Sequence, residues 1–319
     1  MSDQVVPLSG AGAGRERGRV RGMSMRRKEA LQGYLFASPW LLGLFIFTIG
    51  PMAFSLYISF TRYDILSPPT WLGLANYHDL FLGDPMFWTA LGNTLYYTVF
   101  SVPLGMLGSL LLALLLNRQV RGIALFRAAY YIPTVISTVP VSILWIWLLD
   151  PSAGLINTAL AVVGIHGPTW LASPEWSKPS LVLMSLWGIG GATMVIYLAG
   201  LQGIPQHLYE AAQIDGATKW KQFRHITLPM LSPTSFFVLI IGIIGSFQVF
   251  TQAWVMTQGG PLDSTTFYSL YLYKEGFNYL YMGYASAMAW VLLVITLALV
   301  LLNFVMSRRW VYYEGGLNG

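Results

Sequence analysis

The charged residues inside this chain are concentrated in one stretch, from Ile204 to Pro229. Acid–base or metal chemistry would require several such groups to converge on one atom, whereas docking to another protein requires only an exposed polar surface. The stretch has more charges close together than any other internal part of the chain, and they lie within fifteen positions: Glu210, Asp215, Lys219, Lys221 and Arg224. Because long apolar segments flank it on both sides, the stretch is predicted to lie outside a membrane as a docking segment.

The first half of this stretch is predicted to be a short helix. Pro205 suits a first helical turn, because its missing N–H would have no partner there. Leu208, Ala211 and Ala212 then share one face at i, i+3, i+4 spacing. The small side chains of the two alanines would let another protein approach that face closely.

The second half contains the residues that end this helix and begin the next. Gly216 is predicted to adopt the left-handed conformation that ends a helix. Thr218 is predicted to cap a second short turn through Phe223, and Pro229 to open the next long helix. The docking helix is therefore expected to be held between two membrane spans.

The same residues resemble a known motif. The segment is similar to the EAA loop of bacterial ABC-importer permeases, because it contains Glu210-Ala211-Ala212, three residues, Gly216, nine residues and then Ile226-x-Leu228-Pro229. The longer form YEAAQIDGA is similar to the carbohydrate-uptake branch of that family, the maltose and glycerol-phosphate type. The alternative is an ordinary cytoplasmic loop. The resemblance covers roughly residues 30–310 and implies that the following residues couple the chain to an ATPase: Tyr209, Glu210, Ala211, Ala212, Asp215, Gly216, Ile226, Leu228 and Pro229.

The rest of the chain lacks patterns that indicate catalysis. No G-x-x-x-x-G-K-[ST] phosphate-binding loop occurs, and the chain has no cysteine. The four histidines are scattered, and none has another ligand at metal-binding spacing. We therefore predict no catalytic residue, no metal site and no cofactor, and we expect ATP hydrolysis to reside in a separate partner subunit.

The composition indicates a polytopic membrane protein. Of the 319 residues, 55% are hydrophobic and 10% are charged, whereas soluble domains have about 25% charged residues. Six stretches without Asp, Glu, Lys or Arg are long enough for the ~20 residues that span a bilayer: roughly 35–61, 86–117, 128–149, 179–204, 228–257 and 281–307. The expected fold class is an all-α membrane protein with six transmembrane helices and a cytoplasmic coupling helix. The resemblance implies the type I ABC-importer permease fold.

The Lys and Arg residues predict the orientation. Fifteen of the 18 would lie on one side: seven in the N-terminal tail, three between the second and third spans, three in the docking segment and two at the C-terminus. Only Arg62, Lys178 and Lys274 would lie on the other side. Because basic residues mark the cytoplasmic side, both termini and the docking segment are expected there. The predicted parts are a basic disordered tail, a permease domain, the coupling loop within it and a cytoplasmic C-terminal tail: 1–33, 34–310, 204–229 and 311–319.

The predicted spans contain no charged residue at membrane depth, which favours a path for a neutral, hydroxyl-rich solute. In the fourth span, Trp187 precedes Gly188, Gly190 and Gly191, where backbones could approach closely or leave a cavity. In the fifth span, two faces are predicted, one with Gly242, Gly245, Ser246 and Val249 and the other with Gln248 and Gln252. We predict pathway lining by Ser246 and Trp187, and secondarily by Gln248 and Gln252. The alternative is that the small residues only pack helices together.

Aromatic and turn residues occupy the outer connections. Trp71, Gly73, Leu74, Asn76 and Tyr77 are similar to the W-x-G-L-x-N-Y stretch of the resembled family, as is the turn 257–261 after the fifth span. Trp88 and Trp170 are predicted to anchor the chain at the membrane interface.

The sequence thus predicts a membrane-spanning permease subunit of an ATP-driven importer for sugars or related polyhydroxylated solutes. It would form half of the translocation pathway and couple to the ATPase through the EAA loop. The resemblance implies a second homologous permease subunit, two ATP-binding-cassette subunits and an extracytoplasmic solute-binding protein, all at the bacterial inner membrane and without nucleic acid. Two alternatives are a secondary carrier or channel for a neutral solute without an ATPase, and a non-transporting scaffold or receptor subunit.

Overall fold

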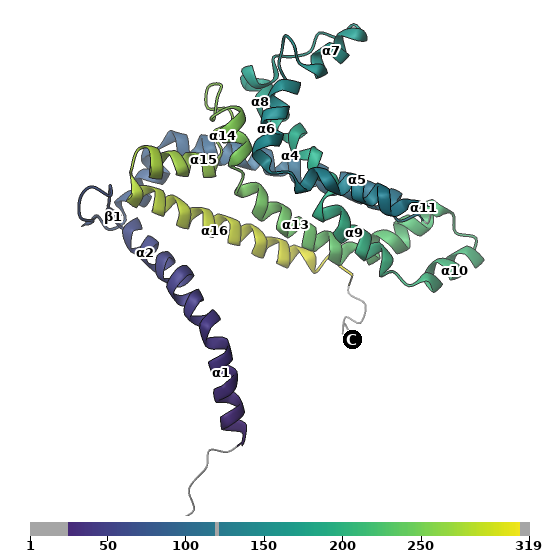
Figure 1. Ribbon diagram of the computed structural model, residues 1–319, viewed down its shortest axis with the longest axis horizontal. Helices are drawn as coiled ribbons and strands as arrows, with labels where there is room; N and C mark the ends of the chain where they lie inside the picture. Colours follow the sequence, from purple (N-terminus) through teal and green to yellow (C-terminus); the bar gives the residue numbers. More distant parts are fainter. Residues whose placement is uncertain (1–24, 119–120, 313–319) are drawn as a thin grey trace, which may run out of the picture. The chain divides into compact units, whose positions relative to one another are not determined.

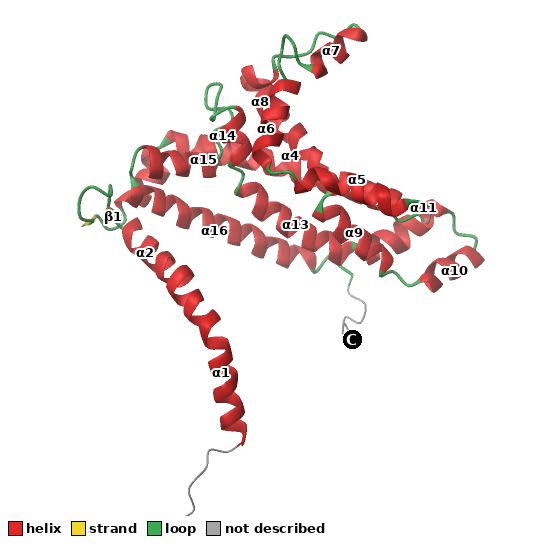
Figure 2. Ribbon diagram, in the orientation of Figure 1, coloured by secondary structure: helices red, strands yellow, loops and turns green. Residues whose placement is uncertain are grey.

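The computed structural model describes residues 25–118 and 121–312, which are mostly helical (Figure 2). The chain divides at Phe54 and Ser55 into two units, which are described separately. Among the described residues, the β-structure is one two-stranded antiparallel ribbon of β1 (Thr61–Arg62) and β2 (Thr70–Trp71).

The first unit is one long helical rod. It contains α1 (Met25–Leu44), the π-helical segment η1 (Phe45–Ile49) and the start of α2 (Gly50–Ser59). Residues Gln32–Ser59 are apolar and long enough to be the first membrane span. The prediction of a disordered tail over 1–33 is wrong for residues 25–33, because the run MRRKEALQG consists almost wholly of good helix formers. The remainder of the predicted tail, residues 1–24, lies outside the described residues.

The second unit is a bundle around α4 (Pro85–Leu116), the longest helix among the described residues, which packs against the helices of the third, fourth and fifth spans (Figure 1). Its long or apolar elements are α5 (Ile123–Val135), α6 (Thr138–Leu148), α8 (Pro174–Ser185), the 3₁₀ segment η4 (Leu186–Gly190), α9 (Ala192–Gln202), α13 (Ser232–Phe247), α14 (Thr251–Met256) and α16 (Met282–Ser307). The shorter connecting elements are α3 (Ala75–His78), η2 (Asp79–Gly83), α7 (Leu155–Val162), η3 (Trp170–Ala172), α10 (Gln206–Ile214), α11 (Lys219–Gln222), η5 (Phe223–Thr227), α12 (Leu228–Met230), α15 (Tyr268–Tyr273) and η6 (Lys274–Asn278). Helices α10 and α11 lie at one end of the bundle, and α15 and the ribbon lie at the other (Figure 1).

The expected six-span helical fold is confirmed, but two of the spans bend sharply. In the described residues, four helices are long enough to span a membrane, and the bent pairs α5–α6 and α8–α9 bring the number to six. The third span bends by 92° between α5 and α6. Pro140 explains this break, because it has no N–H for the carbonyl of Ile136 and its ring would clash with that carbonyl in a continuous helix.

The fourth span bends by 46° after its glycines. A Cβ on Gly190 would collide with the backbone oxygen of Tyr130, and a Cβ on Gly191 would touch the Thr134 side chain at 2.6 Å. The prediction that these glycines allow close backbone approach is therefore confirmed, and α5 is the partner helix.

One carboxylate joins three elements at the end of the bundle that carries α15. Asp84 Oδ1 accepts a hydrogen bond from Met86 N at 2.8 Å and so caps α4. Asp84 Oδ2 accepts from Tyr271 Oη of α15 at 2.7 Å and from Tyr284 Oη of α16 at 2.6 Å. Because hydrogen bonds to an ionised carboxylate are strong, this group fixes the starts of α4 and α16 beside α15.

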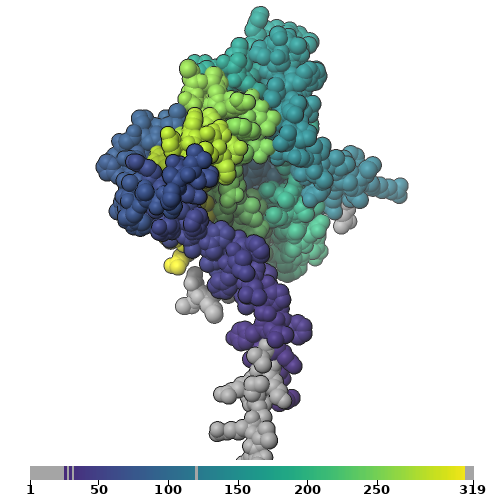
Figure 3. All heavy atoms as spheres, turned by 60° about the vertical axis from the view of Figure 1, so that its left-hand side comes forward, coloured from purple at the N-terminus to yellow at the C-terminus, as the bar shows by residue number. Residues whose placement is uncertain are grey.

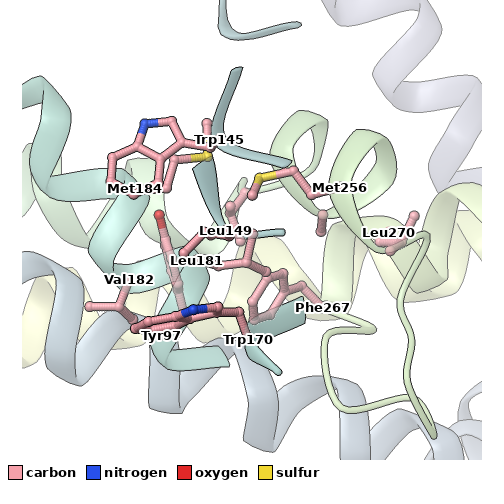
Figure 4. Close-up of a cluster of buried hydrophobic side chains, with 12 residues drawn as sticks. Tyr97, Trp145, Leu149, Trp170, Leu181, Val182, Met184, Met256, Phe267 and Leu270 are labelled. Carbon is pink, nitrogen blue, oxygen red and sulfur yellow. The ribbon is translucent and has the colours of Figure 1, made fainter. Parts of the chain in front are cut away.

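The two tryptophans predicted as interfacial anchors differ in their surroundings. Trp88 is 54% exposed, as such an anchor would be. Trp170 is only 8% exposed; it lies in a buried cluster with Tyr97, Leu181 and Phe267 (Figure 4). Its Nε1 donates to Asn157 Oδ1 at 2.6 Å. The anchor prediction for Trp170 is therefore wrong, because the outer connection folds back and gives its ring a core to fill.

Candidate functional site

The predicted docking segment is a helix, α10, that ends in a left-handed glycine. Gly216 has φ = +73°. Its N–H donates to the carbonyl of Gln213 at 3.0 Å, and the N–H of Ala217 donates to the carbonyl of Ala212 at 2.8 Å. This pair of bonds is the Schellman motif, which satisfies carbonyls that the helix end would otherwise leave free. The predicted helix end is thereby confirmed.

The elements that follow α10 return the chain to the bundle. Thr218 caps α11, and its Oγ1 accepts from Lys221 N at 3.4 Å. Pro205 is the N-cap of α10 rather than a residue of its first turn. Pro229 lies in the short helix α12, while the long helix α13 begins at Ser232. The prediction that Pro229 opens the long helix is therefore off by three residues, because a further proline, Pro233, supplies the same start signal.

One face of the docking segment packs against the bundle, and another face is exposed. Leu208, Tyr209 and Ile226 pack against the buried cluster between α4, α9 and α13. Tyr209 Oη also shares a hydrogen bond with Thr227 Oγ1 at 2.9 Å. Leu208 thus anchors the segment to the bundle. The predicted face is therefore divided, because Leu208 packs inward whereas Ala211 is exposed and Ala212 is half-buried.

The open face carries most of the other predicted coupling residues. Glu210, Ala211, Asp215, Gly216 and Leu228 are exposed, and Ala212 and Pro229 are half-buried. Two large apolar side chains that sequence reasoning missed lie in the same segment: Ile214 is 87% exposed and Trp220 is 67% exposed. An apolar group so exposed beside small and charged residues is typical of a surface that another protein covers. The coupling role of these residues stays a prediction.

A cavity of about 220 Å³ lies between α4, η4 and α13. Its walls contain hydroxyl, amide and small apolar groups and no charged residue: Tyr97, Ser101, Val102, Gly105, Met106, Ser109, Ser185, Gly188, Ile189, Thr193, Val238, Gly242, Gly245, Ser246, Val249 and Gln252. At the end farther from α10, Gln252 Nε2 donates to Tyr97 Oη at 3.2 Å and links α14 to α4.

The predicted pathway residues fall at three different places. Ser246 and Gln252 line this cavity. Trp187 lines an adjoining cavity of about 370 Å³, to which Gln252 also contributes. Gln248 points instead to an apolar groove of about 390 Å³ against α16. The structure thus separates Gln248 from Gln252, which the helical spacing had placed on one face.

The reason is a break in the fifth span. Helix α13 ends at Phe247, and Phe250 has φ = −139° before α14 begins at Thr251. This break turns Gln252 back to the face of Ser246. The spacing argument is correct for Gly242, Gly245 and Ser246 of α13, which line the cavity, and Val249 within the break lines it too.

The contribution of α4 was missed by sequence reasoning. Tyr97, Ser101, Gly105 and Ser109 follow one another at four-residue intervals, and all four line the cavity. Residues i and i+4 share a helix face, so a stripe of polar and small residues in an apolar span was the signal that could have found them.

A second, wider pocket of about 590 Å³ lies at the opposite end of the bundle from α10 and contains several carboxylates. Burial, and secondarily repulsion from Asp84, raises the pKa of Glu275. Burial and donation to Asp84 raise the pKa of Tyr271. The ionised form of Glu275 is therefore disfavoured in the folded protein.

Comparison with known proteins gives consistent matches. Residues 101–312 match the family described as binding-protein-dependent transport system inner membrane component. The chain is 43% identical over 292 residues to the probable ABC transporter permease protein YesP of Bacillus subtilis, covering 90% of this chain and 94% of that protein. It is 35% identical over 295 residues to the lactose transport system permease protein LacF of Rhizobium radiobacter, covering 90% and 97%.

The fold is also similar to a solved structure. A chain of a bacterial ABC transporter involved in the import of the acidic polysaccharide alginate aligns with a TM-score of 0.76 at 30% identity, covering 89% of this chain and 97% of that chain. A second structure of an alginate ABC transporter, with a pentasaccharide-bound periplasmic protein, aligns with the same score.

Proposed function

Because the chain belongs to the family of binding-protein-dependent transport system inner membrane components, we propose that it is a permease subunit of an ATP-driven importer for sugars or related polyhydroxylated solutes. It forms half of the translocation pathway. The names of similar proteins support the solute class, since they include a lactose, an arabinooligosaccharide and a trehalose/maltose transport permease.

The observation that carries the proposal is the uncharged, hydroxyl-lined cavity between the spans that the docking segment connects. When a sugar binds, its hydroxyls exchange hydrogen bonds with water for hydrogen bonds with protein hydroxyls and amides. The cavity offers such groups from five helices, α4, α8, α9, α13 and α14. Its walls carry no acidic or basic side chain that could hold a coupling ion. The driving energy is therefore expected to come from a partner.

The docking segment supplies a physical link to that partner. It joins α9 to α13, which both line the cavity, and it is anchored to the bundle through Leu208 and Tyr209. Its exposed side, with Ala211 and Ile214, is the face that an ATPase subunit would hold. A displacement of this face would be carried to both walls of the cavity, because the loop and the spans share one packed cluster.

The remaining parts of the assembly are part of the same proposal. They are a second homologous permease subunit, two ATP-binding-cassette subunits and an extracytoplasmic solute-binding protein. The distribution of Lys and Arg supports cytoplasmic termini and a cytoplasmic docking segment. ATP hydrolysis belongs to the partner subunits.

The test is uptake of labelled neutral oligosaccharides into vesicles that contain the reconstituted complex and its solute-binding protein. We expect uptake only with ATP. Ala211→Asp puts a charge on the exposed docking face and should abolish ATP-dependent uptake while the chain still inserts. Val162→Asp is the matched control, because Val162 is 84% exposed in the connection between the third and fourth spans. Uptake without ATP, or equal loss in both variants, would contradict the proposal.

A further inference from the structure

Residues 257–267, which follow α14, fold on themselves into a compact segment that we call the strap. Thr265 Oγ1 donates to the carbonyl of Gly260 at 2.8 Å and shares a second hydrogen bond with Thr257 Oγ1 at 2.6 Å. Gly259 has φ = +97°, and a Cβ there would collide with Thr266 Oγ1. The glycine therefore permits both the turn and its closure.

One buried amide fastens the strap to α4. Asn93 is 5% exposed, and its Nδ2 donates to the carbonyls of Asp263 at 2.8 Å and Thr266 at 3.1 Å. Lys178 Nζ of α8 donates to Asn93 Oδ1 at 3.0 Å and lies 5.3 Å from the ring centroid of Tyr96. Because an ammonium only donates, Lys178 holds the amide in the orientation that presents its N–H groups to the strap.

Further contacts seat the strap on both helices. Ser264 Oγ shares a hydrogen bond with Ser177 Oγ of α8 at 2.8 Å. The backbone N–H of Tyr268, directly after the strap, donates to Thr94 Oγ1 of α4 at 2.9 Å. Figure 3 shows the light green part of the chain that contains the strap beside the teal part that contains α8.

The strap lies next to one end of the cavity. Asn93 is one helical turn, about 6 Å, beyond Tyr97 on α4, and Tyr97 lines the cavity. The ring of Phe267 lies 5.3 Å from that of Tyr97 (Figure 4). This is the end farther from the docking segment, since α4 runs from Asn93 toward Ser109 at the other end of the cavity.

We propose that Asn93 and Lys178 are gating residues, which hold the strap closed over the outer end of the pathway and release it when solute enters. This inference rests on the proposed transport function. We call the hydrogen bonds of Asn93 and Lys178 the latch. They suit repeated opening, because the bonds from Asn93 to the strap join neutral groups and the bond from Lys178 to Asn93 has a charge on the lysine only. Among the described residues, no carboxylate lies within ion-pair distance of Lys178. Opening therefore separates no pair of opposite charges, which would cost more.

A single introduced cysteine can report the opening, because the chain has none of its own. Ser101→Cys places a thiol on the cavity wall, one turn inside Tyr97, where Ser101 is 9% exposed. The complete transporter is reconstituted without solute, and a membrane-impermeant thiol reagent is added on the side of the solute-binding protein. Mass spectrometry of this chain gives the modification rate of the introduced thiol in Ser101→Cys alone and combined with each latch variant.

Asn93→Ala removes both bonds to the strap and should raise the modification rate roughly tenfold, the change in the open-to-closed ratio that two such bonds support. Lys178→Met keeps the apolar stem and should raise the rate severalfold. Asn157→Ala is the matched control. Asn157 also donates to two loop carbonyls, those of Pro151 at 3.0 Å and Pro168 at 3.2 Å, but it fastens a different connection. Its loss should leave the rate unchanged.

An unchanged rate in the latch variants, or an equal rise in Asn157→Ala, would overturn the inference. If Asn93→Ala does not assemble, Lys178→Met decides alone. ATP-driven uptake by the wild-type complex is measured in parallel. Normal uptake with unchanged labelling would reject the gate only, whereas absence of ATP-driven uptake would reject the proposed function.

Discussion

Gly216 provides a quantitative test of the docking segment. It holds a left-handed conformation, with φ = +73°, and a Cβ at this position would have no atom within 4 Å. Substitution therefore meets no steric obstacle from neighbours, and the whole cost lies in the backbone. For a residue with a Cβ that cost is roughly 1–2 kcal/mol, and it would be larger for a β-branched residue.

This cost converts into an expected loss of ATPase binding. If the ATPase binds only the native turn, Gly216→Ala should weaken its apparent affinity about 5–30-fold. Gly216→Asn should weaken it less, because asparagine adopts the left-handed region more readily. Gly216→Val should weaken it most. The assay is titration of the ATPase subunit onto permease in lipid nanodiscs, with uptake measured beside it.

Gly164 is the matched control. It has φ = +77° and equally open surroundings, but it lies in the connection between the third and fourth spans. Gly164→Ala should therefore carry the same backbone cost without weakening ATPase binding. Native affinity in all three Gly216 variants would refute the reasoning, and so would an equal loss in Gly164→Ala.

The remaining predictions concern the cavity, the carboxylate pocket and the topology. Ser246→Phe should block uptake without preventing assembly because Ser246 lines the cavity, whereas Gln248→Phe on the groove toward α16 should have little effect; equal uptake in both variants would show that Ser246 only packs. Glu275→Gln should raise the Tm at pH 8, since the raised pKa makes the ionised carboxylate destabilising there. This gain should fade as the pH falls toward the ordinary carboxyl value of 4.5 and should be absent below it; a gain that persists at lower pH would exclude a charge effect. In intact cells an impermeant thiol reagent should label Lys274→Cys and not Lys221→Cys, and the reverse result would invert the proposed orientation.

Local sequence signals predicted the docking segment well. Gly216, Thr218 and the alanines of α10 are conformational signals that act over a few residues, so their spacing was sufficient. The start of α13 was misplaced at Pro229, because Pro229 and Pro233 give the same local signal and only packing selects between them.

The cavity was predicted only in part. Gly242, Gly245 and Ser246 of α13 lie on the expected face, because the helical period holds as far as Phe247. Gln248 and Gln252 were placed together incorrectly, since the period fails at the break before α14. The stripe of polar and small residues from Tyr97 to Ser109 is visible in the sequence, but its place on the cavity wall was not predicted, because spacing alone does not show which span lies opposite it.

By itself, the sequence determined the membrane class, the number of spans and the docking segment. Each of these depends on a local free energy: apolar transfer for the spans, and capping and backbone conformation for the segment. Only the tertiary structure decided which faces meet. The close approach of the fourth span to α5, the burial of Trp170 and the contact of Asn93 with the strap join residues that are far apart along the chain. Such contacts depend on shape complementarity between whole elements, which residue spacing within one element does not encode.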